Sequence, residues 1–126
     1  MRTFILCLFI MVLLICVWFY VYSSLEDMYT YSTTQLTELN SLIESDNWNL
    51  ASIKIEEFEK YIHKKERRFG TLIHHEDMEV IYESVLKLRN HIHYKDKIKS
   101  SLEIELLKHF ISSAKDNQSL SFYNIF

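Results

Sequence analysis

Proline is absent from this chain of 126 residues, and glycine occurs once, as Gly70. Tight turns between β-strands favour these two residue types, so the composition leaves little material for a β-rich fold. The length gives room for one small domain. We therefore expect an all-α protein.

Charge is absent from Phe4 to Tyr22. As an α-helix this run spans about 28 Å, close to the roughly 30 Å hydrocarbon core of a bilayer. The apolar part of a cleaved signal peptide is shorter, about 7–15 residues, although Val21-Tyr22-Ser23 resembles a weak cleavage site. Trp18 and Tyr20 crowd the far end, as in helices that end at a membrane interface. We predict an uncleaved transmembrane anchor over residues 1–23, with residues 4–22 in the lipid bilayer.

Basic residues are nearly missing around this anchor, because Arg2 precedes it and the next one is Lys54. The positive-inside rule then places the N-terminus in the cytoplasm and residues 24–126 outside the cytoplasmic membrane. Every acidic residue and every basic residue except Arg2 follows Tyr22, and the whole chain carries a net charge of −3. A net-acidic domain lacks the basic surface that nucleic acid requires, so we expect no nucleic-acid partner.

Cysteine is absent outside the anchor, where Cys7 and Cys16 lie nine residues apart. That separation along one helix prevents a disulfide between them. We interpret both as small apolar residues in lipid.

Beyond the anchor, apolar residues recur every three or four positions, which is the period of an amphipathic helix. The first helix either continues from the anchor or begins after a break at Ser23-Ser24, since Ser24 and Asp27 have capping-box spacing. Asp46 and Asp96 are the predicted N-caps of the second and fourth helices, and Gly70 is the predicted end of the second. The stripes are Leu25, Met28, Ser32, Leu36, Leu39 and Ile43; Trp48, Ala51, Ile55, Phe58 and Ile62; Met78, Ile81, Val85, Leu88 and Ile92; and Ile104, Leu107, Ile111 and Ala114.

The fourth helix has a second apolar side, formed by Ile98, Leu102, Leu106 and Phe110. A helix that is apolar round much of its circumference is usually enclosed, so we expect it to be the most buried of the four. The tail 120–126 is also apolar and is expected to dock back on the domain. Short connections favour antiparallel neighbours. The predicted architecture is an N-terminal transmembrane helix followed by a small antiparallel bundle of about four helices, or helical hairpins, over residues 24–126.

The stretches SDNWNLASIKIEEFEKYIHKKERRFGTLIHHEDMEVIYESVLKLRNHI and SLSFYNIF carry a further pattern. From about Thr34 to Phe126 the chain resembles the family known as domain of unknown function 4363, although Tyr61 stands where that family more often has Trp. The resemblance implies a small bacterial membrane-anchored helical protein of the cell envelope, encoded beside larger integral membrane proteins, and no known activity. The positions that match the family pattern, which we interpret as packing positions, are Trp48, Ala51, His75, Glu76, Leu120, Asn124 and Ile125.

Histidine is the residue type here most suited to chemistry, but its spacing is unfavourable for a metal site. His75 and Glu79 provide only two ligands, and no His-Glu-x-x-His or Cys-x-x-Cys motif is present. We interpret His74 as packing at a turn, His75 as a cap, and His63, His91 and His93 as solvated. We predict no catalytic residues, no metal and no cofactor. The alternative is a histidine-based metal or pH sensor, with His74 or His109 as the titrating group.

Two surface features remain. The basic cluster 64–68 either forms a charged last helical turn or contacts anionic lipid or an acidic partner. On the second helix, Leu50, Ile53 and Tyr61 lie opposite the main stripe, so this helix is either sandwiched inside the bundle or keeps one stripe for a partner. We therefore expect a non-enzymatic module that binds or supports another membrane or envelope protein, with Leu50, Ile53 and Tyr61 as candidate contacts.

Overall fold

The computed structural model describes the backbone of residues 1–69 and 75–125 and the side chains of residues 1–68 and 76–117. This part of the chain forms four α-helices and contains no strand. They are α1 (Arg2–Glu44), α2 (Trp48–Phe69), α3 (His75–His93) and α4 (Lys97–Ile125). The predicted all-α class is therefore confirmed.

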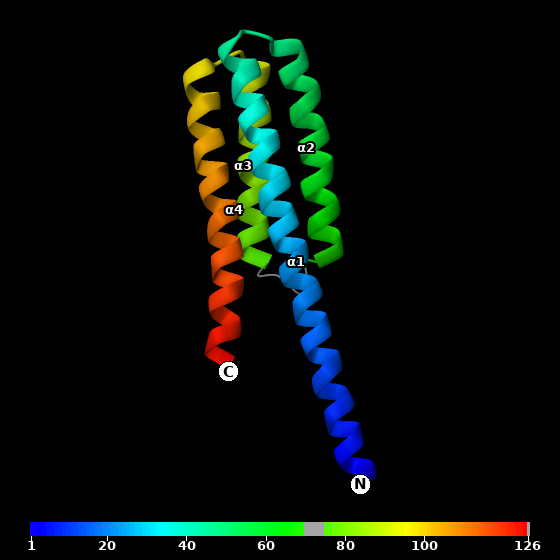
Figure 1. Ribbon diagram of the computed structural model, residues 1–126. Helices are drawn as coiled ribbons and strands as arrows, with labels where there is room; N and C mark the ends of the chain where they lie inside the picture. The colour runs from blue at the N-terminus through cyan, green and yellow to red at the C-terminus, as the bar shows by residue number, and fades with distance from the viewer. Residues whose placement is uncertain (70–74, 126) are drawn as a thin grey trace.

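Successive helices run antiparallel, and each packs mainly against two others (Figure 1). The second half of α1 contacts α2 and α4, while α3 contacts α2 and α4 from the opposite corner. This is an up-down-up-down four-helix bundle, the arrangement that short connections favour. The predicted antiparallel bundle is confirmed, with α1 contributing both the N-terminal segment and one wall of the bundle.

Helix α1 is much longer than its neighbours and continues through Ser23 and Ser24 without a break. Its first part projects alone from the bundle, and its side chains are exposed as far as Val17 (Figure 1). Among the described residues, α1 is the one helix long and apolar enough to cross a membrane. The structure is thus compatible with a single-pass anchor. Burial begins at Val21, so the predicted boundary between residues 23 and 24 lies inside one rigid helix.

Two turns of three residues, 45–47 and 94–96, close the end of the bundle farthest from the N-terminus. In the first, the N–H of Asp46 bonds to the carbonyl of Ile43, and that of Asn47 to the carbonyl of Leu42. The second turn repeats this pattern, which is the Schellman motif. Asp46 and Lys95 have φ angles of 59° and 55°, so both occupy the left-handed position that usually carries glycine.

This turn geometry corrects one predicted cap. Asp46 is not the N-cap of α2, because the carbonyl of Asn47 accepts the first bond of that helix, from the Ala51 N–H at 3.1 Å. Asp46 belongs to the preceding turn instead. The predicted cap at Asp96 is confirmed, since its Oδ1 accepts a bond from the Lys99 N–H at 3.1 Å. Helix α2 ends at Phe69, and the predicted stop residue, Gly70, lies outside the described residues.

The core consists of the four predicted stripes, with Trp48 half-buried at its edge. In α2, α3 and α4 the buried positions alternate spacings of three and four, as in the knobs-into-holes packing of coiled coils. Helix α1 departs from this rule, because Met28, Ser32 and Leu36 are separated by four and four. An insertion of this kind locally unwinds a supercoil. Ser32 itself is buried in the core, and its hydroxyl has no hydrogen-bond partner among the described residues.

Polar contacts between neighbouring helices fix their register. Arg89 Nη1 of α3 donates to Glu59 Oε2 of α2 at 2.6 Å, and Lys54 of α2 pairs with Glu38 of α1. The Ser84 hydroxyl donates to Glu103 Oε1 at 2.6 Å between α3 and α4. Surface ion pairs contribute only about 0–1 kcal/mol each, so the apolar core supplies most of the stability and these contacts select one alignment.

Candidate functional site

The second apolar stripe predicted on α2 is divided by the structure. Leu50 and Ile53 are 50% and 54% exposed, whereas Tyr61 is half-buried and packs against the core. The sandwich alternative therefore does not apply to Leu50 and Ile53, because neither is enclosed by a neighbouring helix. Tyr61 serves the bundle itself, so only two of the three candidate contacts lie on a free surface.

Tyr61 is held by the ring of Tyr31 from α1, with the ring centroids 4.2 Å apart. Burial, followed by the effects of Tyr31 and Asp27, raises the pKa of Tyr61 to about 12. A phenol in this environment stays protonated at neutral pH and does not act as a base. The residue is a packing element of the α1–α2 interface.

The most extensive exposed apolar surface of the bundle lies on α4. Ile98, Leu102 and Leu106 are 82%, 60% and 40% exposed, and Phe110 follows them as a half-buried residue at the edge of the core. We call these first three residues the α4 stripe. The expectation that α4 is the most enclosed helix is therefore wrong.

The reason lies in the geometry of a four-helix bundle. Ile104, Leu107 and Ile111 face the core, and positions four residues apart such as 98, 102 and 106 form a separate row on the helix surface. Each helix of the bundle has two main neighbours, so its outward side has no covering element among the described residues. Two apolar rows on one helix predict two contacts, but they do not say that both contacts lie within the same chain.

The hollow with the largest volume among those described, about 660 Å³, lies between α2 and α3. It is open and mixed in character, with acidic, basic and apolar side chains along its walls. Ser52 and His93 both line it. The lining residues are Ser52, Ile55, Glu56, Leu86, Lys87, Arg89, Asn90 and His93.

The histidines are dispersed over the bundle. His63 lies against the ring of Tyr82, with ring centroids 5.8 Å apart, while His93 and His109 are exposed and His91 is half-buried. No group of three or more His, Cys, Asp or Glu side chains converges on a metal-sized site within the described residues. The side chains of His74 and His75 lie outside the described set. Nothing in the described geometry favours the sensor alternative.

The remaining predicted positions are placed as follows. Ala51 is fully buried against the core beside half-buried Trp48, and Glu76 is exposed in the first turn of α3. The backbone of Leu120, Asn124 and Ile125 continues α4 as helix, so the tail extends that helix, and its side chains are outside the described set. Cys7 and Cys16 are exposed on the apolar part of α1.

Comparison with known proteins gives one result. The model of the family described as "Domain of unknown function (DUF4363)" matches residues 19–125, and the chain belongs to this family. The match begins at the end of the uncharged run, at residue 19, and covers the bundle, so the family unit includes the passage from the apolar part of α1 into the bundle. No curated protein and no solved structure matches the chain.

Proposed function

We propose that the chain is a single-pass membrane protein whose bundle binds another membrane protein along the α4 stripe. The observation that carries this proposal is the exposure of Ile98, Leu102 and Leu106 in one row of a helix whose other apolar row is fully buried. Burying a Leu or Ile side chain is worth about 1.5–3 kcal/mol, so covering this row gives a partner a substantial part of its binding free energy. The bundle acts by binding, without catalysis or a cofactor.

The proposed occupant is a single helix of the partner. From Ile98 to Leu106 the row extends about 12 Å along α4, or a little over two helical turns, which suits the apolar face of another helix. Lys95 and Lys99 are exposed next to Ile98 in the sequence, so acidic residues flanking the apolar face of the partner helix would complement this end.

The anchor restricts which proteins meet this surface. Because α1 runs without a break from the apolar segment into the bundle, the stripe is held at a fixed height, and Ser101 beside it contacts Asn40 of α1, about 27 Å along that helix from Tyr22. A partner helix must then lie in the layer at this height, where a protein anchored in the same membrane is held beside the stripe. Arg2 before the anchor and the long gap to Lys54 favour a cytoplasmic N-terminus, so the proposed layer is outside the cytoplasmic membrane.

Site-specific photocrosslinking tests the partner proposal. A photoreactive amino acid is placed at residue 102 of the full chain, and at residue 53 as the matched control, since Ile53 has nearly the same exposure on α2. We expect one discrete membrane protein crosslinked from position 102 and none from position 53. Leu102→Glu should reduce its co-purification at least tenfold while Ile53→Glu does not, with helix content by circular dichroism unchanged in both.

Other outcomes contradict the proposal. An adduct with twice the mass of the chain would show that the α4 stripe joins two copies of this protein. A partner crosslinked only from position 53 would move the interface to Leu50 and Ile53. A separate pair of topology reporters, one active only outside and one only inside the cytoplasm, each fused after Phe126, tests the proposed orientation. Activity of the inside reporter alone would overturn it.

A further inference from the structure

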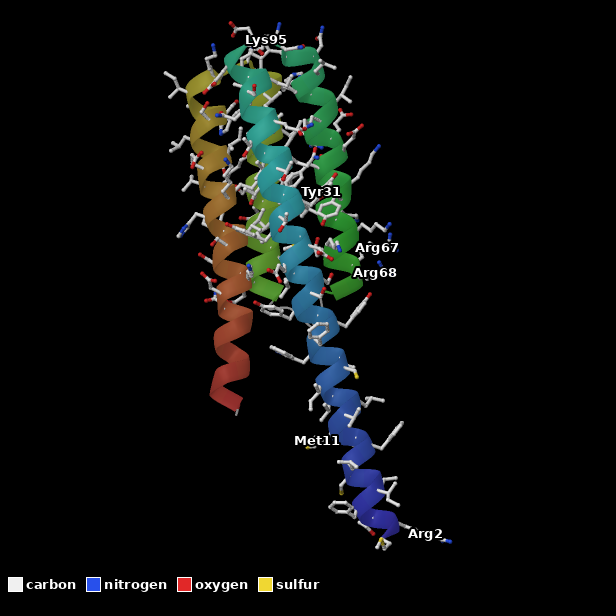
Figure 2. The ribbon with its side chains drawn as sticks, in the orientation of Figure 1. Arg2, Met11, Tyr31, Arg67, Arg68 and Lys95 are labelled. Carbon is white, nitrogen blue, oxygen red and sulfur yellow. The ribbon has the colours of Figure 1, made fainter. Side chains whose placement is uncertain are left out.

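Basic side chains gather at the end of α2 that faces the apolar part of α1. Figure 2 shows Arg67 and Arg68 at the end of the bundle from which the N-terminal segment emerges, and Lys95 at the opposite end. Lys64 and Lys65 lie on the same last turns of α2. We call Lys60, Lys64, Lys65, Arg67 and Arg68 the basal cluster.

One contact fixes the height of the basal cluster above the apolar segment. Lys65 Nζ donates to Ser24 Oγ of α1 at 3.4 Å. Ser24 comes two residues after Tyr22, the last residue of the uncharged run, which is about 3 Å along the helix axis. Arg67 and Arg68 follow Lys65 on a helix that runs toward the apolar segment, so they start still closer to it.

This height coincides with the headgroup layer of a bilayer that contains the apolar segment. Headgroups add about 5–7 Å on each side of the roughly 30 Å hydrocarbon core. Lys65 at the level of Ser24 therefore lies in that layer, and the long side chains of Arg67 and Arg68 start within reach of lipid phosphates.

The outward face of the basal cluster forms an open hollow with a uniform lining. Its volume is about 520 Å³, and it is lined by Lys60, His63, Lys64, Arg67 and Arg68. All of these side chains are hydrogen-bond donors that carry or can accept positive charge. Their positions on successive turns of α2 aim several donors at the same space, which suits an oxyanion with multiple acceptor oxygens.

Among the described residues, the protein offsets only part of the charge of the basal cluster. Lys64, Arg67 and Arg68 form no ion pair within the described part of the chain, and Glu66 lies 3.9 Å from His63. Burial, Arg68 and Lys64 lower the pKa of Lys65, against an opposing effect of Asp27. The helix dipole favours cations at this end of α2, and an external anion would offset the repulsion that remains between the like charges.

We propose that the basal cluster binds the phosphate of anionic lipid headgroups and so seats the bundle on the bilayer surface. This inference rests on the proposed membrane anchoring of residues 4–22, but it does not depend on the orientation of the chain or on the α4 stripe. An acidic protein is the competing occupant. Lipid is favoured because the anchor keeps headgroups at this height permanently, whereas an acidic protein would have to be recruited to it.

The test uses the full chain in nanodiscs that contain equal amounts of phosphatidylglycerol and phosphatidylcholine. Native mass spectrometry measures the ratio of the two lipids that stay bound to the released protein. We expect the anionic lipid to be retained preferentially, and Arg67→Glu with Arg68→Glu to lower that ratio roughly tenfold. The matched control, Lys95→Glu with Lys99→Glu, makes the same charge change at the opposite end and should leave the ratio within about twofold.

Two further arms separate the alternatives. Arg67→Gln with Arg68→Gln tests the site without introducing acidic groups, in case charge reversal disturbs the fold, and should show a smaller loss in the same direction. Inorganic phosphate added at millimolar concentration should not displace the lipid, since it lacks the bilayer that holds headgroups at this height. Displacement by it would assign the site to free phosphate instead.

The failures are distinguishable from those of the proposed function. A chain that does not enter nanodiscs contradicts the anchoring itself. A chain that enters but shows no preference for the anionic lipid, or loses it equally in the Lys95 and Lys99 control, overturns the headgroup site alone. Loss of the crosslinked membrane protein on charge reversal, with the lipid ratio unchanged, would make the basal cluster part of a protein interface.

Discussion

The rings of Tyr31 of α1 and Tyr61 of α2 lie with their centroids 4.2 Å apart and their planes tilted by 40°, and they join the two helices. Lys65 Nζ lies one turn further along α2, 5.6 Å from the Tyr61 ring centroid. Lys65 of the basal cluster therefore lies directly beside the tyrosine pair, on the same side of α2 as Tyr61. The tyrosine pair gives a pH-dependent stability that can be measured.

The first prediction concerns Tyr61. Its pKa is raised from 10.0 to about 12 in the folded protein. The fold therefore favours the neutral phenol, and its stabilising effect is complete below about pH 10 and is lost as pH rises toward about 12. We expect the free energy of unfolding of the full chain in detergent micelles to fall more steeply over this range for the native protein than for Tyr61→Phe. Exposed Tyr94→Phe should match the native protein, and identical slopes for all three would refute the assignment.

The second prediction concerns the left-handed residue Lys95. Its φ of 55° carries a steric cost for a side chain with a Cβ, and glycine avoids it. Because glycine also gains entropy in the unfolded chain, Lys95→Gly should raise the free energy of unfolding by a net amount of about 0.5–1 kcal/mol. Urea titration provides the measurement. Lys99→Gly, inside the first turn of α4, should instead destabilise by about 1 kcal/mol, and a loss of stability in both variants would contradict the turn geometry.

The third prediction separates two aspartates that look alike in the sequence. Asp96→Ala removes the bond from the Lys99 N–H and should lower the free energy of unfolding by about 0.5–2 kcal/mol. Asp46→Lys places at this left-handed position the residue type found at the equivalent position 95, so it removes the exposed pair with Lys97, at 3.3 Å, and should cost about 0–1 kcal/mol. Thermal unfolding of the two variants side by side gives the comparison. A larger cost at Asp46 would restore it as a helix cap.

The fourth prediction concerns the small residue next to Trp48. Ala51 is fully buried, so Ala51→Leu inserts three carbon atoms into a filled core and should cost about 1–3 kcal/mol. Asn49→Leu introduces the same side chain at an exposed position of α2 and should change stability by at most about 0.5 kcal/mol. Equal effects in urea titration would show that position 51 is not restricted by packing.

The apolar rows of the candidate site could be recognised in the sequence. Which of them are buried in the bundle and which stay exposed could not. Both rows of α4 are visible as repeats of three and four, and both halves of α2 show apolar residues at helical spacing. The periodicity indicates which residues prefer contact with apolar surface. It does not say whether another helix of the chain or another protein provides that surface. In the structure Leu50 and Ile53 are exposed, whereas the Tyr61 ring packs against the Tyr31 ring. The position of each residue round α2, relative to α1 and α3, decides which side chains are covered.

The sequence by itself determined the helical class, the four core stripes, the short turns and the long apolar start of the chain, because each follows from local spacing and composition. It also predicted the cap at Asp96, where a carboxylate and a backbone N–H lie three residues apart. Tertiary structure alone decided that α1 passes unbroken through Ser23 and Ser24, since packing of Val21 and Leu25 favours continued helix over a local cap. It alone placed Lys65 beside Ser24, 41 residues earlier, because that contact depends on how two helices align.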